Sequence, residues 1–152
     1  MVPRVEKVME WARSGDDIML VLEPGEEIHT SIQKLADKLD LNGAVITSGI
    51  GRTRNCIFGY MDADFVYHRK ELEEPVELVT LQGNLARHEN GSPFTHLHAT
   101  FSNDDFLTKS GHLFSATVFV VAEIHLRVMS EVVMTRCPMV DGEFVELKFP
   151  SS

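Results

Sequence analysis

The chain has 152 residues, 43% of them hydrophobic, and a formal net charge of −9, as expected for one globular domain with a hydrophobic core. No apolar run approaches the ~20 residues that cross a bilayer, and residues 1–7 mix acid with base, so neither a membrane protein nor a targeting peptide is expected. The two cysteines, Cys56 and Cys137, are too few for a disulfide framework and predict reduced thiols in a cytoplasmic protein.

The acidic balance also weighs against nucleic acid as a partner, because a protein that grips DNA through phosphates needs a basic stripe. Basic residues cluster only at 52–54 and 68–70, and the acidic stretch 71–74 follows the second cluster at once. DNA binding is therefore disfavoured for the chain alone, although an oligomer can concentrate a few charges on one surface.

In the first third of the chain, residues 5–13 fit a strand or a helix equally well, and residues 17–22 predict a buried strand that ends at the turn 23–25. A long helix is expected next, with Glu26 and Glu27 in its first turn and Asn42-Gly43 as its stop. Its apolar face consists of residues at helical spacing, namely Ile28, Ile32, Leu35, Ala36 and Leu39.

From residue 44 onward the pattern is that of strands. A short strand at 44–47 runs into Ser48-Gly49-Ile50-Gly51, which predicts a tight turn where the backbone passes close to something, rather than a dinucleotide loop. Further strands are expected at 56–61, around Tyr67, at 75–83 and at 113–129, the last as one long strand or two with a bulge, with closing strands at 132–134 and 144–149. The turn signal Asn90-Gly91 predicts a hairpin between the strand at 75–83 and the one that carries residues 96–98. One long helix packed on a mostly antiparallel sheet is an α+β fold, here a single domain over residues 1–152.

Three histidines are the chain's most informative chemical feature. His96 and His98 are one residue apart, so in a strand they point to the same face about 7 Å from each other. His112 follows after a turn-rich connection, and a returning strand can deliver it to the same place. Three protein ligands with an open fourth position are typical of a catalytic or ligand-binding zinc site. The alternative is a polar cluster that orients backbone or binds a small anion. The remaining histidines are expected to be hydrogen-bonded, partly buried residues: His29, His68, His88 and His125.

Glu77 is the candidate catalytic carboxylate. It shares a strand face with Val79 and Leu81, and the predicted hairpin would bring its strand beside His96 and His98. It is expected either to act near the metal as a base or hydrogen-bond partner, or to be a solvated charge at the strand start.

Five segments, in this order, resemble the plants and prokaryotes conserved (PPC) domain over about residues 15–135: LEPGE at 22–26, SGIG at 48–51, PVELVTLQGN at 75–84, HLHA at 96–99 and GHL at 111–113. The resemblance implies a fold similar to acetolactate decarboxylase, whose zinc is held by a His-x-His pair and a third histidine, here matching His96, His98 and His112. It also implies the stand-alone prokaryotic type of the domain, which forms homotrimers and is usually described as DNA-binding. In plants the domain accompanies AT-hook segments, and this chain contains no such Arg-Gly-Arg core.

Two functions follow as expectations. The first is a metal-binding PPC-domain protein with a DNA-binding or regulatory role. The second is a small zinc-dependent enzyme, a hydrolase or lyase acting on a carbonyl compound, with Glu77 or Glu123 as proton carrier. The small ligand at the metal is not identified by the sequence.

Overall fold

The structure, a computed structural model, describes residues 9–150, so the expectation for residues 5–8 falls outside the described part. Its elements, in chain order, are β1 (Glu10–Ser14), β2 (Asp17–Leu22), α1 (Ile28–Leu39), β3 (Ala44–Met61), β4 (Tyr67–Leu72), β5 (Val76–His88), β6 (Pro93–Ser102), β7 (Thr108–Val128), β8 (Thr135–Pro138) and β9 (Val145–Lys148). No helix among residues 9–150 is long and apolar enough to cross a membrane.

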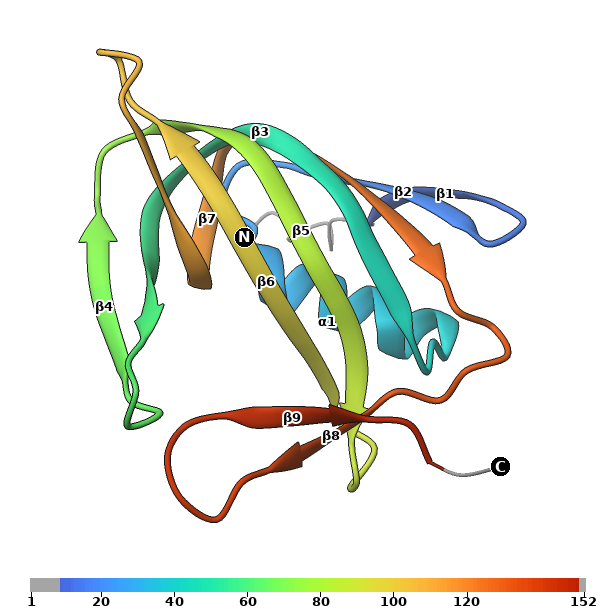
Figure 1. The fold of residues 1–152 in the computed structure, drawn as a ribbon. Helices are drawn as coiled ribbons and strands as arrows, with labels where there is room; N and C mark the ends of the chain where they lie inside the picture. Colours follow the sequence, from blue (N-terminus) through green and yellow to red (C-terminus); the bar gives the residue numbers. More distant parts are fainter. Residues whose placement is uncertain (1–8, 151–152) are drawn as a thin grey trace, which may run out of the picture.

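The strands form one strongly curved sheet of nine strands (Figure 1). The pairs β3–β5, β5–β6, β6–β7 and β7–β3 close a ring, and β2, β4 and β8 extend it outward. All pairs are antiparallel except β5–β8, which is parallel, so the sheet is mixed rather than purely antiparallel. β6 and β7 pair only between residues 98–102 and 108–112, and the two strands separate beyond His98 and His112.

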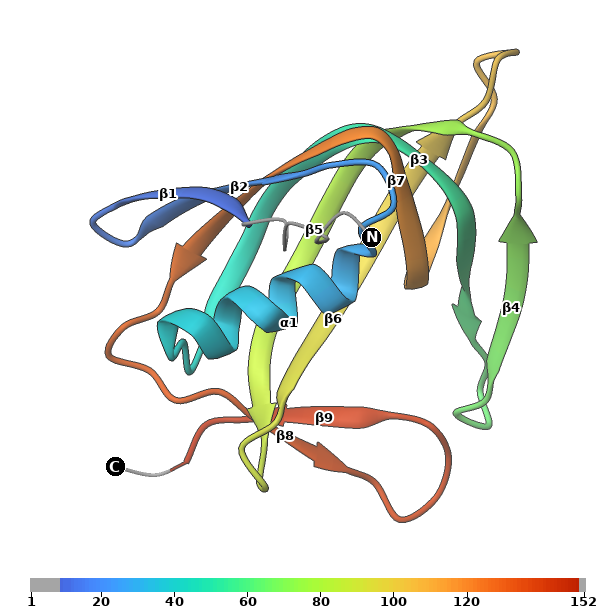
Figure 2. The ribbon, with the colours of Figure 1, turned by 180° about the vertical axis from the view of Figure 1, so that it is seen from behind.

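Helix α1 packs against β6 and β7 on the concave side of the sheet (Figures 1 and 2). With 12 residues it is short, not the long helix expected, because Glu27 caps its first turn and Asp40 ends it in a left-handed conformation with φ 53°. The Glu27 carboxylate accepts hydrogen bonds from the backbone N–H of His29 and Thr30, each at 3.0 Å. The helix buries the predicted apolar face, since Ile28, Ile32, Leu35 and Ala36 have no exposed surface.

Two strand predictions differ from the structure. Ser48 to Gly51 is not a turn but part of β3, which continues for 18 residues. Gly51 is needed there because a Cβ would lie 2.0 Å from the Val121 carbonyl oxygen of β7, so the expected close backbone approach is real. Residues 132–134 lie outside any strand, and the closing hairpin instead begins at Thr135. The long strand expected after residue 112 is present as the single strand β7, with irregular register against β3.

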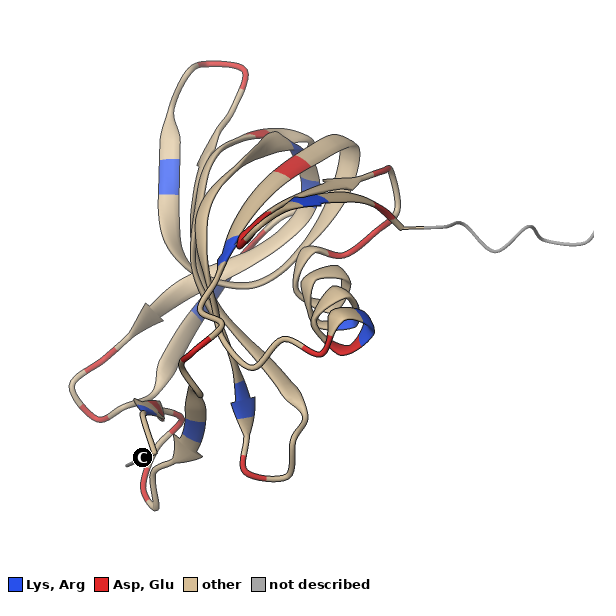
Figure 3. Cartoon of the chain, turned by 90° about the vertical axis from the view of Figure 1, so that its right-hand side faces the viewer, with Lys and Arg blue, Asp and Glu red and all other residues tan. Residues whose placement is uncertain are grey.

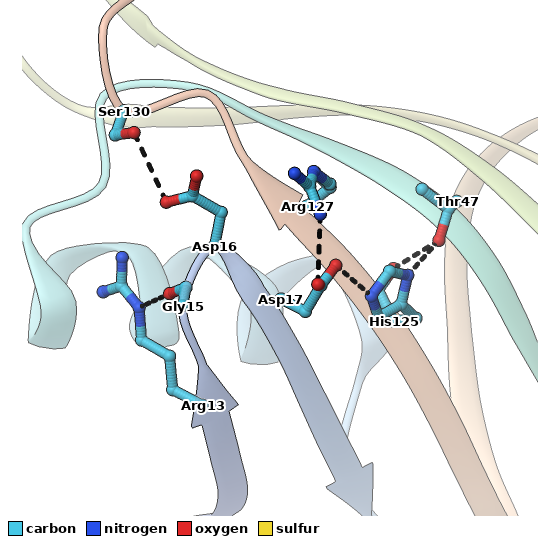
Figure 4. Close-up of polar contacts among 8 residues, drawn as sticks. All are labelled: Arg13, Gly15, Asp16, Asp17, Thr47, His125, Arg127 and Ser130. Atoms are coloured by element: carbon cyan, nitrogen blue, oxygen red, sulfur yellow. Dashed lines mark hydrogen bonds and ion pairs between the residues drawn. The ribbon is translucent and has the colours of Figure 1, made fainter.

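A polar network ties three strands together at the far end of β7 (Figure 4). Asp17 of β2 lies 2.9 Å from His125 Nε2 and accepts from Arg127 at 3.1 Å, and His125 Nδ1 contacts the Thr47 hydroxyl of β3. The hydrogen bond from His125 is the main cause that lowers the pKa of Asp17. This network holds β2 and β3 on either side of β7.

Candidate metal centre

His96, His98 and His112 come together where β6 and β7 separate. His98 is the cross-strand partner of His112, and His96 lies two residues further along the same face of β6. The ring centroids are 5.2 Å apart for His96–His98, 5.1 Å for His96–His112 and 5.4 Å for His98–His112. One nitrogen from each ring lies within 4.8 Å of the other two. The strand positions deduced for the three histidines thus match the structure.

His29 supports this arrangement from the helix side. It bridges the gap between the strands, with Nε2 2.7 Å from the Leu113 carbonyl and Nδ1 2.6 Å from the Thr95 hydroxyl. Because the carbonyl can only accept, Nε2 carries the proton and Nδ1 accepts from Thr95. Gln33 donates to the same Thr95 oxygen at 2.9 Å. Thr95 and Leu113 each adjoin one of the cluster histidines, so α1 fixes the backbone that presents them.

Burial keeps the inner histidines neutral. It is the main cause that lowers the pKa of His96 to about 4, with the Arg136 charge as the next cause. Burial also lowers the pKa of His112 to about 4, followed by the neighbouring His96 and His98. Both imidazoles are therefore uncharged at pH 7, which is the form that donates a lone pair to a metal.

An aromatic wall flanks His112. The Tyr67 hydroxyl of β4 lies 3.3 Å from His112 Nδ1, and the Phe114 ring centroid is 4.7 Å from the His112 ring. A phenol that holds one ring nitrogen orients the imidazole and leaves Nε2 for another partner. Arg69 stacks over Phe114 at 4.2 Å and is paired with Glu143 at 3.3 Å.

No sequence motif pointed to Arg136, the most deeply buried charged group at the site, with 3% of its surface exposed. It donates from Nη2 to Asn84 Oδ1 at 2.5 Å and from Nη1 to the Val145 carbonyl at 2.9 Å. Asn84 is the cross-strand partner of His96, which places the guanidinium beside the cluster. Arg136 belongs to β8, and that strand was predicted three residues too early.

The cluster opens into a cavity of about 350 Å³ between β4, β6, β7 and the β8–β9 hairpin. The cavity is lined by His96 and His112, by Arg136, Arg69 and Glu143, and by the apolar side chains of Phe94, Leu113, Phe114, Phe144 and Val145. A second hollow of about 480 Å³, lined by His96, His98, Gln82 and Thr47 among others, lies on the other side of His96.

The structure does not bring Glu77 to the histidines. The hairpin predicted between β5 and β6 is present, but its turn at residues 89–92 sets the register so that Asn84 and Gln82 oppose His96 and His98. Glu77 opposes Ser102, four residues further along, or ~13 Å at strand spacing. It is exposed and paired with Arg52 at 3.1 Å, as in the solvated alternative. Glu123 lies eleven residues beyond His112 on β7 and lines a separate hollow with Glu77.

Fold and site together define a class: small domains whose curved sheet carries three histidines beside a cavity. The model of the plants and prokaryotes conserved domain matches residues 9–130, and the chain belongs to this family. No curated protein matches the chain.

Solved structures with the same fold include relatives at moderate identity. A plant- and prokaryote-conserved protein from Pyrococcus horikoshii is 30% identical, with a TM-score of 0.77, over 95% of this chain and 99% of that one. A metal-containing protein from Archaeoglobus fulgidus is 32% identical, with a TM-score of 0.76, over 94% of this chain and 100% of the other. A proposed DNA-binding protein from Bacteroides thetaiotaomicron shares the fold, with a TM-score of 0.84 at 20% identity over 94% and 99% of the two chains.

Proposed function

We propose that this chain binds one divalent metal ion, zinc, through His96, His98 and His112, and presents its open position to a small ligand. The observation that carries the proposal is the convergence of three ring nitrogens to within 4.8 Å of one another. In a tetrahedral zinc site, ligands at 2.0–2.1 Å from the metal are ~3.3 Å apart, so small side-chain adjustments suffice. The metal-containing relative from Archaeoglobus fulgidus supports the same reading.

The donor set fits zinc. Three imidazoles, two of them kept neutral by burial, are the nitrogen ligands that zinc accepts at catalytic and ligand-binding sites, and a fourth position remains for an exogenous ligand. When bound, such an ion acts as a Lewis acid toward an oxygen of the ligand. Nickel or copper can occupy the same nitrogen site in a purified sample. Among divalent metals, the affinity of such sites rises to a maximum at copper, with nickel and zinc on either side of it.

Binding ranks ahead of catalysis as the role of this centre. The carboxylate that lines the cavity is Glu143, and its pKa is lowered, chiefly by the hydrogen bond from the Tyr67 backbone N–H. An ionised carboxylate of low pKa that already holds Arg69 is a weak general base at pH 7. A hydrolase or lyase acting on a carbonyl compound remains the second candidate, favoured by the open metal position.

A regulatory role on DNA is a further candidate, suggested by the description of the Bacteroides relative. The net charge of −9 opposes it for the chain alone. Assembly into a homotrimer is proposed with it, because within residues 9–150 β1, β4 and β9 each pair on one side only and leave sheet edges to cover.

The test is the metal content of protein purified without added metal, followed by zinc titration under calorimetry. Wild type should bind about one ion per chain, and His98→Ala should lose at least a hundredfold in affinity. His98 is exposed, so its removal leaves the core intact. His68→Ala, an exposed histidine that pairs with Asp62, is the matched control and should bind as wild type. Equal zinc affinity of His98→Ala and wild type would refute the site.

A further inference from the structure

Arg136 differs in what it contacts from the four arginines of the sheet that form ion pairs; the remaining two, Arg13 and Arg54, are exposed to solvent. Arg52, Arg69, Arg87 and Arg127 each pair with a carboxylate, at 3.1, 3.3, 2.8 and 3.1 Å. Arg136 is more buried than any of them, yet its two contacts are neutral oxygens, from Asn84 and Val145. Its Nε is buried without a hydrogen-bond partner among residues 9–150.

A buried guanidinium without a counter-ion is costly. Arginine stays protonated in proteins, and burying an unpaired charge carries a desolvation penalty of several kcal/mol. Within residues 9–150 no carboxylate lies within the 4.0 Å of an ion pair from this guanidinium. Phe94, 5.2 Å from the guanidinium carbon, offsets part of the penalty through its ring face. The missing counter-ion is therefore expected to come from outside residues 9–150.

The position of Arg136 shows where that anion would sit. The residue lines the same cavity as His96 and His112. A divalent ion held by neutral imidazoles would add two further positive charges, so the cavity would be strongly electropositive despite the acidic chain.

The rest of the cavity limits the kind of anion. Its volume of about 350 Å³ is near the lower end for small-molecule sites. Much of the wall is apolar, formed by Phe94, Leu113, Phe114, Phe144 and Val145. The second cationic side chain, Arg69, is already paired with Glu143. One unpaired guanidinium in an apolar cavity matches a monoanion with a hydrocarbon body better than a phosphate, which needs several donors.

We propose that this cavity binds a small organic carboxylate, held by Arg136 beside the open metal position; this rests on the metal centre proposed above. The carboxylate supplies the counter-ion for Arg136, and the apolar part of the ligand packs on the aromatic wall. Arg136 is thereby a specificity-determining residue for the ligand of the metal centre.

A ligand series on the unmodified protein tests the charge requirement. Zinc-loaded wild type is titrated by calorimetry with benzoate, with the neutral isostere benzamide, and with inorganic phosphate. Benzoate should bind at least tenfold more tightly than either of the others. The cobalt-substituted protein should show a change in its visible spectrum on benzoate addition. Equal affinity for benzoate and benzamide, or tighter binding of phosphate, would overturn the proposal.

A pair of variants tests the residue. Arg136→Gln keeps two hydrogen-bonding groups and removes the charge, and it should lose at least tenfold in benzoate affinity while it retains one zinc per chain. Arg87→Gln is the matched control: Arg87 also bonds backbone carbonyls, of Leu41 and Ala36, but pairs with Asp37 and lies outside the cavity lining. It should bind benzoate as wild type.

The two proposals fail in different ways. If wild type takes up no zinc, the metal centre is refuted. If wild type binds zinc but Arg136→Gln binds benzoate as tightly as wild type, the assignment of Arg136 is refuted while the metal centre stands. Should Arg136→Gln not fold, the benzoate and benzamide comparison on wild type still decides the question.

Discussion

At the scale of single residues, the sequence predicted the placement of the proposed metal-ligating histidines, because side chains alternate between the two faces of a strand. It did not predict residues that reach the site from distant segments of the chain. His96 and His98 share a strand face by simple alternation, and His112 needed only a returning strand. Arg136 gave no such signal, because its neighbourhood depends on a parallel contact between β5 and β8 across some 50 residues of chain. Glu77 was misplaced because a hairpin alone does not fix which residues face each other: three residues, 89–91, separate His88 from its partner Ser92, and this loop length places His96 opposite Asn84.

His29 links β6 to β7 beside the three histidines, through Thr95 and the Leu113 carbonyl. His29→Ala would remove the acceptor of the Thr95 O–H, whose oxygen keeps only the hydrogen bond from Gln33, and would remove the His29 donor to the Leu113 carbonyl. Each partly buried group left unsatisfied costs about 1–3 kcal/mol, so the free energy of unfolding should fall by about 2–4 kcal/mol. Urea unfolding of the metal-free protein measures this. His68→Ala, at an exposed position, should change the value by less than about 0.5 kcal/mol. A His29→Ala protein as stable as wild type would contradict the bridging role.

The same residue makes stability depend on pH. Burial is the main cause that lowers the pKa of His29 below its ordinary 6.5, against the opposing charge of Glu27. Below pH 6.5 the unfolded chain takes up a proton that the folded chain resists, so the free energy of unfolding falls as pH decreases and is regained above pH 6.5. Because His96 and His112 shift in the same direction, the comparison must be between wild type and His29→Gln, both metal-free. The variant should show a shallower decline, by at most ~1.4 kcal/mol per pH unit. Parallel curves would count against a buried neutral His29.

At the scale of elements, hydrophobic periodicity identified α1 and most strands, and the differences arise from close backbone contacts. The Gly49-Ile50-Gly51 sequence has the composition of a turn, but in β3 its glycines allow neighbouring strands to approach. A Cβ on Gly49 would meet the Leu81 side chain at 2.6 Å, and one on Gly51 the backbone of β7. Such demands come from partners that are distant in sequence, so local composition cannot distinguish them from a turn. Helix length was overestimated for a local reason, since the cap at Glu27 and the left-handed Asp40 both lie inside the expected boundaries.

Gly83 couples strand packing to the metal centre. It lies between Gln82 and Asn84 on β5, and a Cβ there would be 1.8 Å from the His96 carbonyl oxygen. Gly83→Ala should therefore push β6 away at His96, lower the free energy of unfolding by about 2–3 kcal/mol and weaken zinc binding at least tenfold. Gly15→Ala is the control, since no atom lies within 4 Å of its Cβ and only its φ of 60° is unfavourable. That change should cost about 1 kcal/mol and leave zinc affinity unaltered. Thermal unfolding and zinc titration of both variants distinguish the two effects.

At the scale of the whole molecule, the proposed homotrimer needs contacts between chains, and exposed apolar side chains are candidates for them. Ile50 and Val120 line one hollow on the sheet and are each 54% exposed. Light scattering at micromolar concentration should give three times the mass of one chain, and Val120→Glu should reduce that mass by placing a charge in the contact. Val140→Glu, at a fully exposed position in the β8–β9 loop, should remain trimeric. A monomeric wild type would refute this prediction.

The distribution of charge predicts how the molecule treats DNA. Figure 3 shows Lys and Arg as scattered, separate segments, with Asp and Glu gathered mainly in the loops; residues 9–150 present no continuous basic stripe in this view. The chain has 14 basic and 23 acidic residues, and its Lys and Arg side chains do not provide the six to ten phosphate contacts that a strong DNA binder makes. Fluorescence anisotropy with a labelled duplex should therefore show no submicromolar binding near 150 mM salt.

The triple variant Glu71→Lys, Glu73→Lys, Glu74→Lys is the control for this assay. It extends the short basic run at 68–70 and changes the net charge from −9 to −3, because each substitution adds two units. It should bind measurably at low salt and lose that binding steeply as salt rises, which shows that the assay detects phosphate contacts. Submicromolar binding by the unmodified chain at 150 mM salt would instead restore DNA as its partner.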